Sequence, residues 1–268
     1  MGAKDFRVRS GKAFRLKDRD PDWTGGFKSK EEAVRRLQTG IDALRELQER
    51  LYAQDRWAVL LVFQAMDAAG KDSTIEHVMS GINPQGCQVF SFKGPSAEEL
   101  DHDFLWRTTR CLPERGRIGV FNRSYYEEVL IVRVHPEILA RQKLPPELVT
   151  KAIWKERYED INAFERFLSR NGTRVVKFFL HVSKKEQEER FLARLDEPEK
   201  HWKFALGDVK EREHWDAYMK AYEDMIRHTA TQYAPWHVVP ADRNWVKGYA
   251  TAALVVEALE RLDPRLPT

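Results

Sequence analysis

A glycine–lysine pair that follows a run of small residues is the first feature of this sequence that could do chemistry. The segment reads AMDAAGKDST over residues 65–74 and comes shortly after an apolar stretch at residues 57–63. A strand, a small-residue loop and a helix start together form a phosphate cradle, because backbone N–H groups attract anions and a lysine adds positive charge. We therefore expect Lys71 to be catalytic, and the rest of the loop to bind phosphate through Ala68, Ala69, Gly70, Asp72, Ser73 and Thr74.

This loop matches the pattern G-x-x-x-x-G-K-[ST] imperfectly. Ala65 stands at the first glycine, Asp72 stands at the hydroxyl position, and Ser73 comes one residue late. A tight turn between a strand and a helix, with an exposed lysine, is the alternative interpretation. The preceding strand and the following helix favour the phosphate site, because a phosphate loop works in that context.

A second candidate group, FNRSYYEE at residues 121–128, follows another apolar strand. P-loop kinases place a metal-linked carboxylate at the end of the strand beside the phosphate loop, and Asn122 stands at that position here. Arg123 could stabilise the charge of a transferring phosphoryl group, and Glu127 and Glu128 follow in the next predicted helix. Ser124 could cap that helix, a role that is compatible with phosphate binding.

Residues 184–213 form a third candidate region, which is rich in basic side chains. Arg190 and Arg194 are four residues apart, so they share one helix face. That face could be ordinary solvated surface, with Glu186 pairing with Arg190, but its position after a strand of a P-loop fold favours an arginine-bearing lid. Pro198 ends the predicted helix, and the loop beyond it carries Lys200, His201 and Lys203.

Alternating strands and helices must position these groups. A continuous apolar run, typical of a parallel strand buried on both faces, occurs at residues 57–63, and similar short apolar strands follow at residues 88–92, 117–121, 174–182 and 236–239. Helical patterns cover residues 30–52, 74–82, 97–112, 125–134, 148–171, 185–195, 211–232 and 244–262. The alternation predicts an α/β fold, a parallel sheet flanked by helices with right-handed crossovers.

We expect a single domain over residues 1–268, with an N-terminal extension and helix over residues 1–55 and a lid over residues 184–213. An edge hairpin is predicted within residues 6–17, around a serine–glycine pair. Ligands of such sheets bind beyond the carboxyl ends of the strands. The first two candidate groups both follow strand ends, so we expect them to meet there.

The composition excludes several classes of protein. The 45 basic and 42 acidic residues give a net charge of +3, which is too even for a general binder of nucleic acids or membranes. The two cysteines and eight histidines show no zinc-ligand spacing. The longest apolar run, residues 57–63, is far shorter than the ~20 residues that span a bilayer, and no secretory signal is visible. We expect a cytoplasmic protein.

Together, these motifs resemble those of the second polyphosphate kinase family. The matching segments span roughly residues 57–245 in family order, and their joint presence is far more specific than the phosphate loop alone. They are QAMDAAGKD at residues 64–72, LWR at 105–107, FNRSYYE at 121–127, FFLHVSK at 178–184, WKF at 202–204 and YAPW at 233–236.

The resemblance implies a P-loop kinase fold of the thymidylate-kinase type, in which inorganic polyphosphate is the phosphoryl donor to a nucleotide. By position, Asp67 would hold Mg²⁺ together with Glu127, and Mn²⁺ could replace it. Arg123 and Arg133 would contact donor or acceptor phosphates, and Arg190 resembles the lid arginine. Polyphosphate would be bound by Arg194, Lys200 and Lys203.

Asn122 and Glu127 depart from the commoner family pattern, which has Asp and a neutral residue at these positions. The departure is associated with the subgroup that uses both nucleoside mono- and diphosphates, so we expect conversion of AMP to ADP and of ADP to ATP. The long helical patterns at residues 148–171 and 211–232 would suit a homo-oligomer, a dimer or tetramer, but could also pack within one chain.

Two other functions stay open at this point. An ATP-dependent nucleotide kinase would share the fold and the loop, although the missing first glycine counts against it. A non-catalytic regulator that binds polyanions is the second alternative. Such a binder needs no carboxylates beside its phosphates, so Asp67 and Glu127 favour an enzyme.

Overall fold

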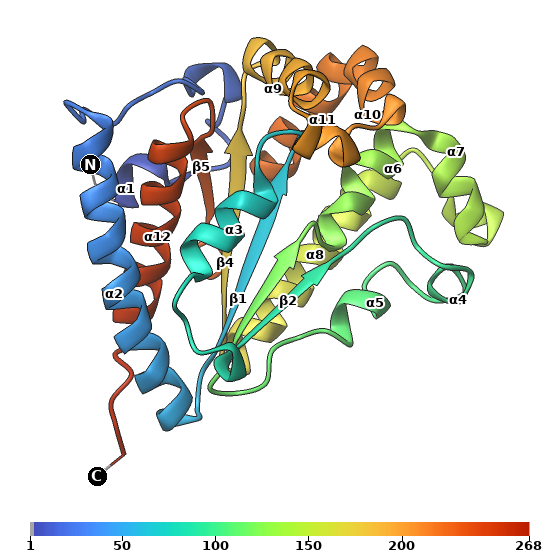
Figure 1. Ribbon diagram of the computed structural model, residues 1–268. Helices are drawn as coiled ribbons and strands as arrows, with labels where there is room; N and C mark the ends of the chain where they lie inside the picture. The colour runs from blue at the N-terminus through green and yellow to red at the C-terminus, as the bar shows by residue number, and fades with distance from the viewer. Residues whose placement is uncertain (1–2, 268) are drawn as a thin grey trace.

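The computed structural model describes residues 3–267, except for the side chains of Ala3 and Lys203. Its centre is a five-stranded sheet in which every strand pairs in parallel, in the order β2-β3-β1-β4-β5. The prediction of a five-stranded parallel sheet is confirmed (Figure 1). The strands are β1 (Ala58–Ala65), β2 (Cys87–Ser91), β3 (Ile118–Asn122), β4 (Thr173–His181) and β5 (Trp236–Pro240).

Helices cover both faces of the sheet at its central strands (Figure 1), whereas no residue of the edge strand β2 is fully buried. On one face lie α3 (Lys71–Met79) and α12 (Asn244–Glu260), with α2 (Lys30–Gln54) packed alongside α12. On the other face lie α8 (Ile153–Arg170) and α11 (Trp215–Thr229). The remaining helices are α1 (Ala3–Phe6), α4 (Ala97–Leu100), α5 (Trp106–Thr109), α6 (Ile131–Val134), α7 (Pro136–Leu139), α9 (Lys184–Asp196) and α10 (Leu206–Glu211).

Strand β1 lies at the middle of the sheet and is buried along its whole length. This burial explains its unbroken apolar sequence, because helices cover both of its faces. In the register, Phe63 of β1 pairs with Asn122 of β3, and Ala65 pairs with Leu180 of β4. The carboxyl ends of these three strands therefore meet at one edge, where the loops that follow them face each other.

The predicted N-terminal hairpin is wrong. The segment instead contains α1 and a short 3₁₀ helix, η1 (Leu16–Asp18), and between them Arg7 forms an isolated antiparallel bridge with His237 of β5. The Val8 N–H donates to the carbonyl of Trp236 at 2.9 Å. Phe6 and Val8 are buried in the main core. Pairing with a distant strand thus takes the place of the local turn.

Three helical predictions need correction. Residues 97–112 form α4 and α5 with a break between them, and residues 125–134 begin as a 3₁₀ helix, η3 (Tyr125–Val129), before α6. The region of residues 211–232 contains η7 (Arg212–His214) before α11. Other 3₁₀ turns are η2 (Pro84–Gly86), η4 (Ala140–Gln142) and η5 (Pro146–Leu148). These boundaries depend on tertiary packing, which a helical apolar pattern does not report.

The basic region of residues 184–213 is helical for most of its length. Helix α9 is followed by η6 (Pro198–Lys203), α10 and η7, so the loop predicted after Pro198 is in fact a 3₁₀ helix. The His201 ring nitrogen Nε2 lies 2.8 Å from the carbonyl oxygen of Leu195 at the end of α9, which holds η6 against that helix. None of the helices within residues 3–267 is long and apolar enough to cross a membrane.

Candidate active site

The loop after β1 carries two left-handed residues that bend it into a cradle. Ala68 has φ of +59° and Gly70 has φ of +87°. A side chain at Gly70 would also be obstructed, because an added Cβ would lie 2.2 Å from the Lys247 Nζ atom. Helix α3 begins directly afterwards, at Lys71. The loop therefore needs glycine at this position both for its backbone conformation and for the close approach of Lys247.

Lys71 is buried, with 9% of its surface exposed, so the alternative of an exposed lysine in a simple turn is wrong. Its ammonium donates to the backbone carbonyls of Ala65 at 2.9 Å and Met66 at 3.3 Å. Burial lowers its pKa, and the nearby Asp67 carboxylate opposes that shift. Within residues 3–267 no carboxylate forms an ion pair with Lys71, so its charge is available to an anion in the loop.

A second lysine, Lys247, lies beneath the same loop and was missed by the sequence analysis. It comes from the first turn of α12, and its ammonium donates to the Ala69 carbonyl at 3.0 Å and to Asn244 Oδ1 at 2.9 Å. Burial, together with the positive charge of Arg190, lowers its pKa to about 7. A lysine near the start of an otherwise apolar helix, shortly after a strand end, was the available signal.

The loop after β3 places a cation against the phosphate loop. Arg123 has φ of +63°, and its guanidinium donates to Asp67 Oδ1 at 2.8 Å. Although burial opposes it, the charges of Glu127 and Asp67 raise the pKa of Arg123. The Asn122 amide donates to Asp72 Oδ1 at 2.5 Å, which joins the end of β3 to the start of α3. The two predicted groups do meet at the strand ends.

Glu127 is held at this edge by a short chain of polar contacts. Gln64, the residue before Ala65 at the end of β1, donates from Nε2 to Glu127 Oε1 at 2.8 Å and accepts from the Ser124 hydroxyl at 3.2 Å. The Ser124 hydroxyl also accepts from the backbone N–H of Tyr126 at 3.1 Å, so its capping role is confirmed. Glu128 points elsewhere and is paired with Arg157 at 3.0 Å.

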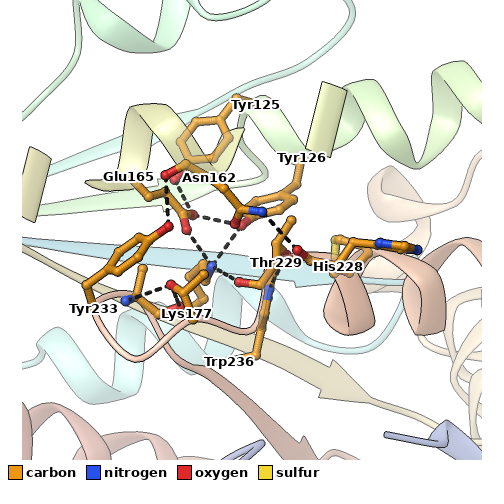
Figure 2. Close-up of polar contacts among 12 residues, drawn as sticks. Tyr125, Tyr126, Asn162, Glu165, Lys177, His228, Thr229, Tyr233 and Trp236 are labelled. Carbon is orange, nitrogen blue, oxygen red and sulfur yellow. Dashed lines mark hydrogen bonds and ion pairs between the residues drawn. The ribbon is translucent and has the colours of Figure 1, made fainter. Parts of the chain in front are cut away.

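Behind this loop, a buried network ties η3 to the sheet (Figure 2). Lys177 of β4 is fully buried, and its ammonium contacts Glu165 at 2.6 Å, the Tyr126 hydroxyl at 2.8 Å and the Thr229 carbonyl at 2.9 Å. The other Glu165 oxygen accepts from the hydroxyls of Tyr125 at 2.9 Å and Tyr126 at 2.7 Å. Because the tyrosines follow Arg123 and Ser124 directly, the network fixes where the arginine emerges from β3.

Two cavities meet at Arg123. The first, of about 580 Å³, is bordered by the phosphate loop and carries cations and carboxylates, among them Lys71, Asp67, Arg194 and Asp208. The second has a mainly apolar surface, with Phe104, Ile131 and Ile138 in its lining, and charged side chains such as Glu99, Asp103 and Arg107 also border it. The residues common to both are Phe92, Lys93 and Arg123. A charged chamber and an apolar chamber therefore share a cationic junction.

The arginines of α9 occupy different positions around the loop. Arg190 does pair with Glu186, at 2.8 Å, and its guanidinium also donates to the carbonyls of Ala68 at 3.0 Å and Ala241 at 2.6 Å. It thus braces the outside of the phosphate loop. Arg194 borders the charged cavity and pairs with Asp208 at 3.3 Å. Burial, followed by the charge of Asp67, raises the pKa of Asp208.

Several predicted site residues lie away from the charged cavity. Arg133 is engaged by Asp224 at 2.8 Å and by the Tyr158 hydroxyl at 2.8 Å, and Lys200 pairs with Glu197 on the surface. Within the loop, Ser73 borders the cavity, while the Thr74 hydroxyl donates back to the Gly70 carbonyl at 2.7 Å. The side chain of Lys203 lies outside the described residues.

The carboxylates of this edge fit the requirements of Mg²⁺ in part. Asp67 and Glu127 both border a small cleft that also contains Arg123. Mg²⁺ is commonly bound by one or two protein carboxylates plus substrate phosphates and water, rather than by an all-protein cage. In keeping with this, residues 3–267 contain no group of three or more His, Cys, Asp or Glu side chains suited to a metal ion. A substrate phosphate would complete the donor set.

The comparison with known proteins decides the family. The profile of Polyphosphate kinase 2 matches residues 27–267. The chain belongs to the polyphosphate kinase 2 family. This membership confirms the resemblance stated from the sequence motifs, and it agrees with the parallel sheet, the phosphate loop and the strand-end arginine described above.

Individual relatives of this polyphosphate kinase 2 chain are similar over nearly their whole length. An ADP-polyphosphate phosphotransferase of Rhodopseudomonas palustris is 56% identical over 98% of this chain and 92% of that protein. An AMP/ADP-polyphosphate phosphotransferase of Meiothermus ruber is 46% identical over 98% and 95%. The crystal structure of polyphosphate kinase 2 from Arthrobacter aurescens TC1 superposes with a TM-score of 0.92 at 41% identity, over 100% of this chain and 92% of that one. The P-loop kinase fold is thereby confirmed.

Proposed function

We propose that the protein transfers the terminal phosphate of inorganic polyphosphate to nucleoside mono- and diphosphates, converting AMP to ADP and ADP to ATP. The observation that carries the proposal is the position of Arg123, which borders both the charged cavity and the apolar one. A phosphoryl group that passes between a polyanionic donor and a nucleotide would cross this junction. The relatives described above carry names for the same kind of transfer.

The charged cavity suits the donor. Lys71, Lys93 and Arg194 contribute positive charge to it, and the loop carbonyls already orient Lys71. Phosphoryl transfer depends on in-line positioning and charge neutralisation more than on covalent help from the protein. These cations would hold the last phosphates of the chain and stabilise the charge that develops on the leaving oxygen.

The apolar cavity suits the acceptor nucleotide. Phe104 and Ile131 offer a surface for a base or a ribose, while Lys93 and Arg123 face the place where its phosphates would lie. An oxygen of the acceptor phosphate then attacks the terminal phosphorus of the donor chain. The new P–O bond forms as the bond to the next phosphate of the chain breaks, and the shortened chain leaves with the electron pair.

Mg²⁺ would be held by Asp67 and Glu127 and would supply neutralisation of the phosphate charge when it is bound. Arg123 donates to Asp67 in the structure, so metal and arginine would share this carboxylate. Asn122, which is uncharged where the family commonly has Asp, lessens repulsion against the additional phosphate of an ADP acceptor. Glu127 supplies a carboxylate on the acceptor side of the junction.

We also propose that the protein works as a homo-oligomer, a dimer or tetramer, in the cytoplasm. The support is apolar surface near and within α8: Phe167 is 62% exposed and Leu148 is 56% exposed. These two side chains lie near opposite ends of α8, and pairing with a second copy would remove their apolar surface from water. Sedimentation equilibrium would test this part of the proposal, and a monomer at micromolar concentration would contradict it.

The proposed transfer is tested by a time course with AMP, excess polyphosphate and Mg²⁺, free of adenylate kinase. We expect ADP to appear first and ATP to follow, because both acceptors use one site. Accumulation of ADP without ATP would restrict the acceptor to the monophosphate and contradict the role given to Asn122. Absence of any product would overturn the proposed function.

A further inference from the structure

A cavity of about 740 Å³, larger than the one at the phosphate loop, lies at the opposite edge of the sheet. It exists because β5 begins only at the register of Lys177, which leaves the first residues of β4 without a neighbouring strand on that side. The amino-terminal segment closes it by bridging Arg7 to His237. Arg174 of β4 borders this cavity. From Arg174 the strand continues for seven residues to His181, which lies near the phosphate loop. At ~3.3 Å per residue, the distance along the strand between the two sites is about 23 Å.

The cavity is bordered by positive charge that the structure does not balance. Five basic side chains from three segments of the chain border it, against a single carboxylate, Glu257. Glu257 is already paired with Arg261. The other four cations form no ion pair with any residue between positions 3 and 267. The cations are Lys4, Arg7, Arg9, Arg174 and Arg261. Like charges held this close repel one another, and a bound anion would relieve that repulsion.

Arg174 is the innermost of these cations. Its Nε atom is buried and has no hydrogen-bond partner among the described residues. Burial lowers its pKa, and the charges of Arg7 and Arg261 lower it further. A buried N–H without a partner is costly, and oxygens of a phosphate are well matched to the donors of a guanidinium. An oxygen of a bound anion in this cavity would accept a hydrogen bond from that N–H.

We propose that this distal basic cavity binds a segment of a condensed phosphate chain remote from the segment that reacts at the phosphate loop. The assignment rests on the proposed function, because it takes the donor to be a long polyanion. Cations from the N-terminal segment, β4 and α12 are spread along the cavity, which suits a row of phosphates rather than one compact charge. A second attachment point would raise the affinity for long chains, because it increases the effective concentration of the reactive end at the phosphate loop.

The test compares donor chains that can and cannot span the two sites. The double variant Arg7→Ala/Arg9→Ala removes two cavity cations but leaves the backbone pairing with β5 in place. The control Arg35→Ala/Lys220→Ala removes the same charge from exposed positions that border neither cavity. For long-chain polyphosphate we expect the cavity variant to raise KM roughly 3–10-fold with kcat unchanged, and to lower the log–log salt slope of binding by about one to two.

For tripolyphosphate, which is too short to span the sites, KM as a donor should be unchanged in the same variant. An unchanged KM for long chains, or an equal rise for short and long chains, would overturn the distal cavity as an attachment point. If the double variant melts early, Lys4→Ala/Arg9→Ala repeats the test on side chains at the exposed end of the segment.

Direct binding separates this proposal from the proposed function. Calorimetric titration of the full chain with tripolyphosphate, without an acceptor, should show a binding event that the cavity variant loses and the control keeps. That result would support the cavity even if the protein transferred no phosphate. Identical titrations of variant and wild type, or tighter binding of ATP or single-stranded RNA than of tripolyphosphate at this site, would overturn it even if transfer were intact.

Discussion

Two buried lysine environments, on opposite faces of the sheet, show how this protein separates structural charge from working charge. Lys177 is surrounded by a carboxylate, a tyrosine hydroxyl and a carbonyl, so its charge is compensated on the spot (Figure 2). Lys71 and Lys247 are held mainly by backbone carbonyls of the phosphate loop. Carbonyls orient an ammonium but carry no full charge to pair with it, so the charge of Lys71 remains available to a phosphate.

We expect substitutions of the two kinds of lysine to have different effects, a loss of turnover at Lys71 and a loss of stability at Lys177. Lys71→Met removes the uncompensated charge at the loop, and we expect kcat to fall roughly 10²–10³-fold, because a preorganised cation acts on charge that develops in the transition state. The side-chain volume is nearly retained, so the melting temperature should change little. Steady-state assays with polyphosphate and ADP check the rate, with the exposed Lys185→Met as the control. A near-normal kcat in Lys71→Met would remove the loop from the mechanism.

Lys177→Met should damage stability more than turnover. Removing one partner of a buried ion pair leaves Glu165 uncompensated, and we expect a loss of about 3–5 kcal/mol in the free energy of unfolding. Urea denaturation measures this loss. Folded molecules should keep kcat within tenfold of wild type, since the ammonium touches no part of the substrate cavities.

The matched control is the double variant Lys177→Met/Glu165→Leu, which removes both charges. Apolar replacement of a whole buried pair is often neutral or stabilising, so most of the lost stability should return. Failure of the double variant to recover would mean that the tyrosine contacts of Glu165, rather than its charge, hold this region together.

The lowered pKa of Lys247 makes the stability of the protein depend on pH. Burial lowers its pKa from 10.5 to about 7, so between these values the unfolded chain binds more protons and stability rises with pH. Lys247→Met removes this contribution. From pH 7 to pH 9, the free energy of unfolding of wild type should rise by on the order of 2 kcal/mol relative to that of the variant. Parallel curves for the two proteins would contradict the lowered pKa.

The contrast also explains what could be predicted from the sequence. Lys71 and Arg123 were identified because each follows an apolar strand, and parallel strands bring their carboxyl ends together. Lys247 was missed because its place under the loop is set by packing of α12 against α3, and its partner Ala69 lies 178 residues away in the chain. A local pattern contains no information on such a contact.

The role of Lys177 could not be predicted from the sequence, for a different reason. It lies inside the apolar run of β4, where a lone charge is usually tolerated only when it is paired, and its partner Glu165 lies on α8. Arg190 pairs with Glu186, the contact that the sequence offered as the alternative to a lid arginine, and its contacts with the carbonyls of Ala68 and Ala241 were not predicted. The N-terminal segment does not form a hairpin because it pairs with β5 instead, through the bridge between Arg7 and His237.

The most direct test of the central claim, that the uncompensated charge of the phosphate loop serves a polyphosphate donor, is a comparison of donors. Purified wild-type protein is given AMP and Mg²⁺ with either polyphosphate or ATP, and kcat/KM is measured for each donor. A long polyanion exploits the cations of the charged cavity more fully than a single triphosphate does. We predict that polyphosphate is preferred at least about tenfold, equivalent to ~1.4 kcal/mol. Equal or better use of ATP would contradict the account and support an ATP-dependent nucleotide kinase.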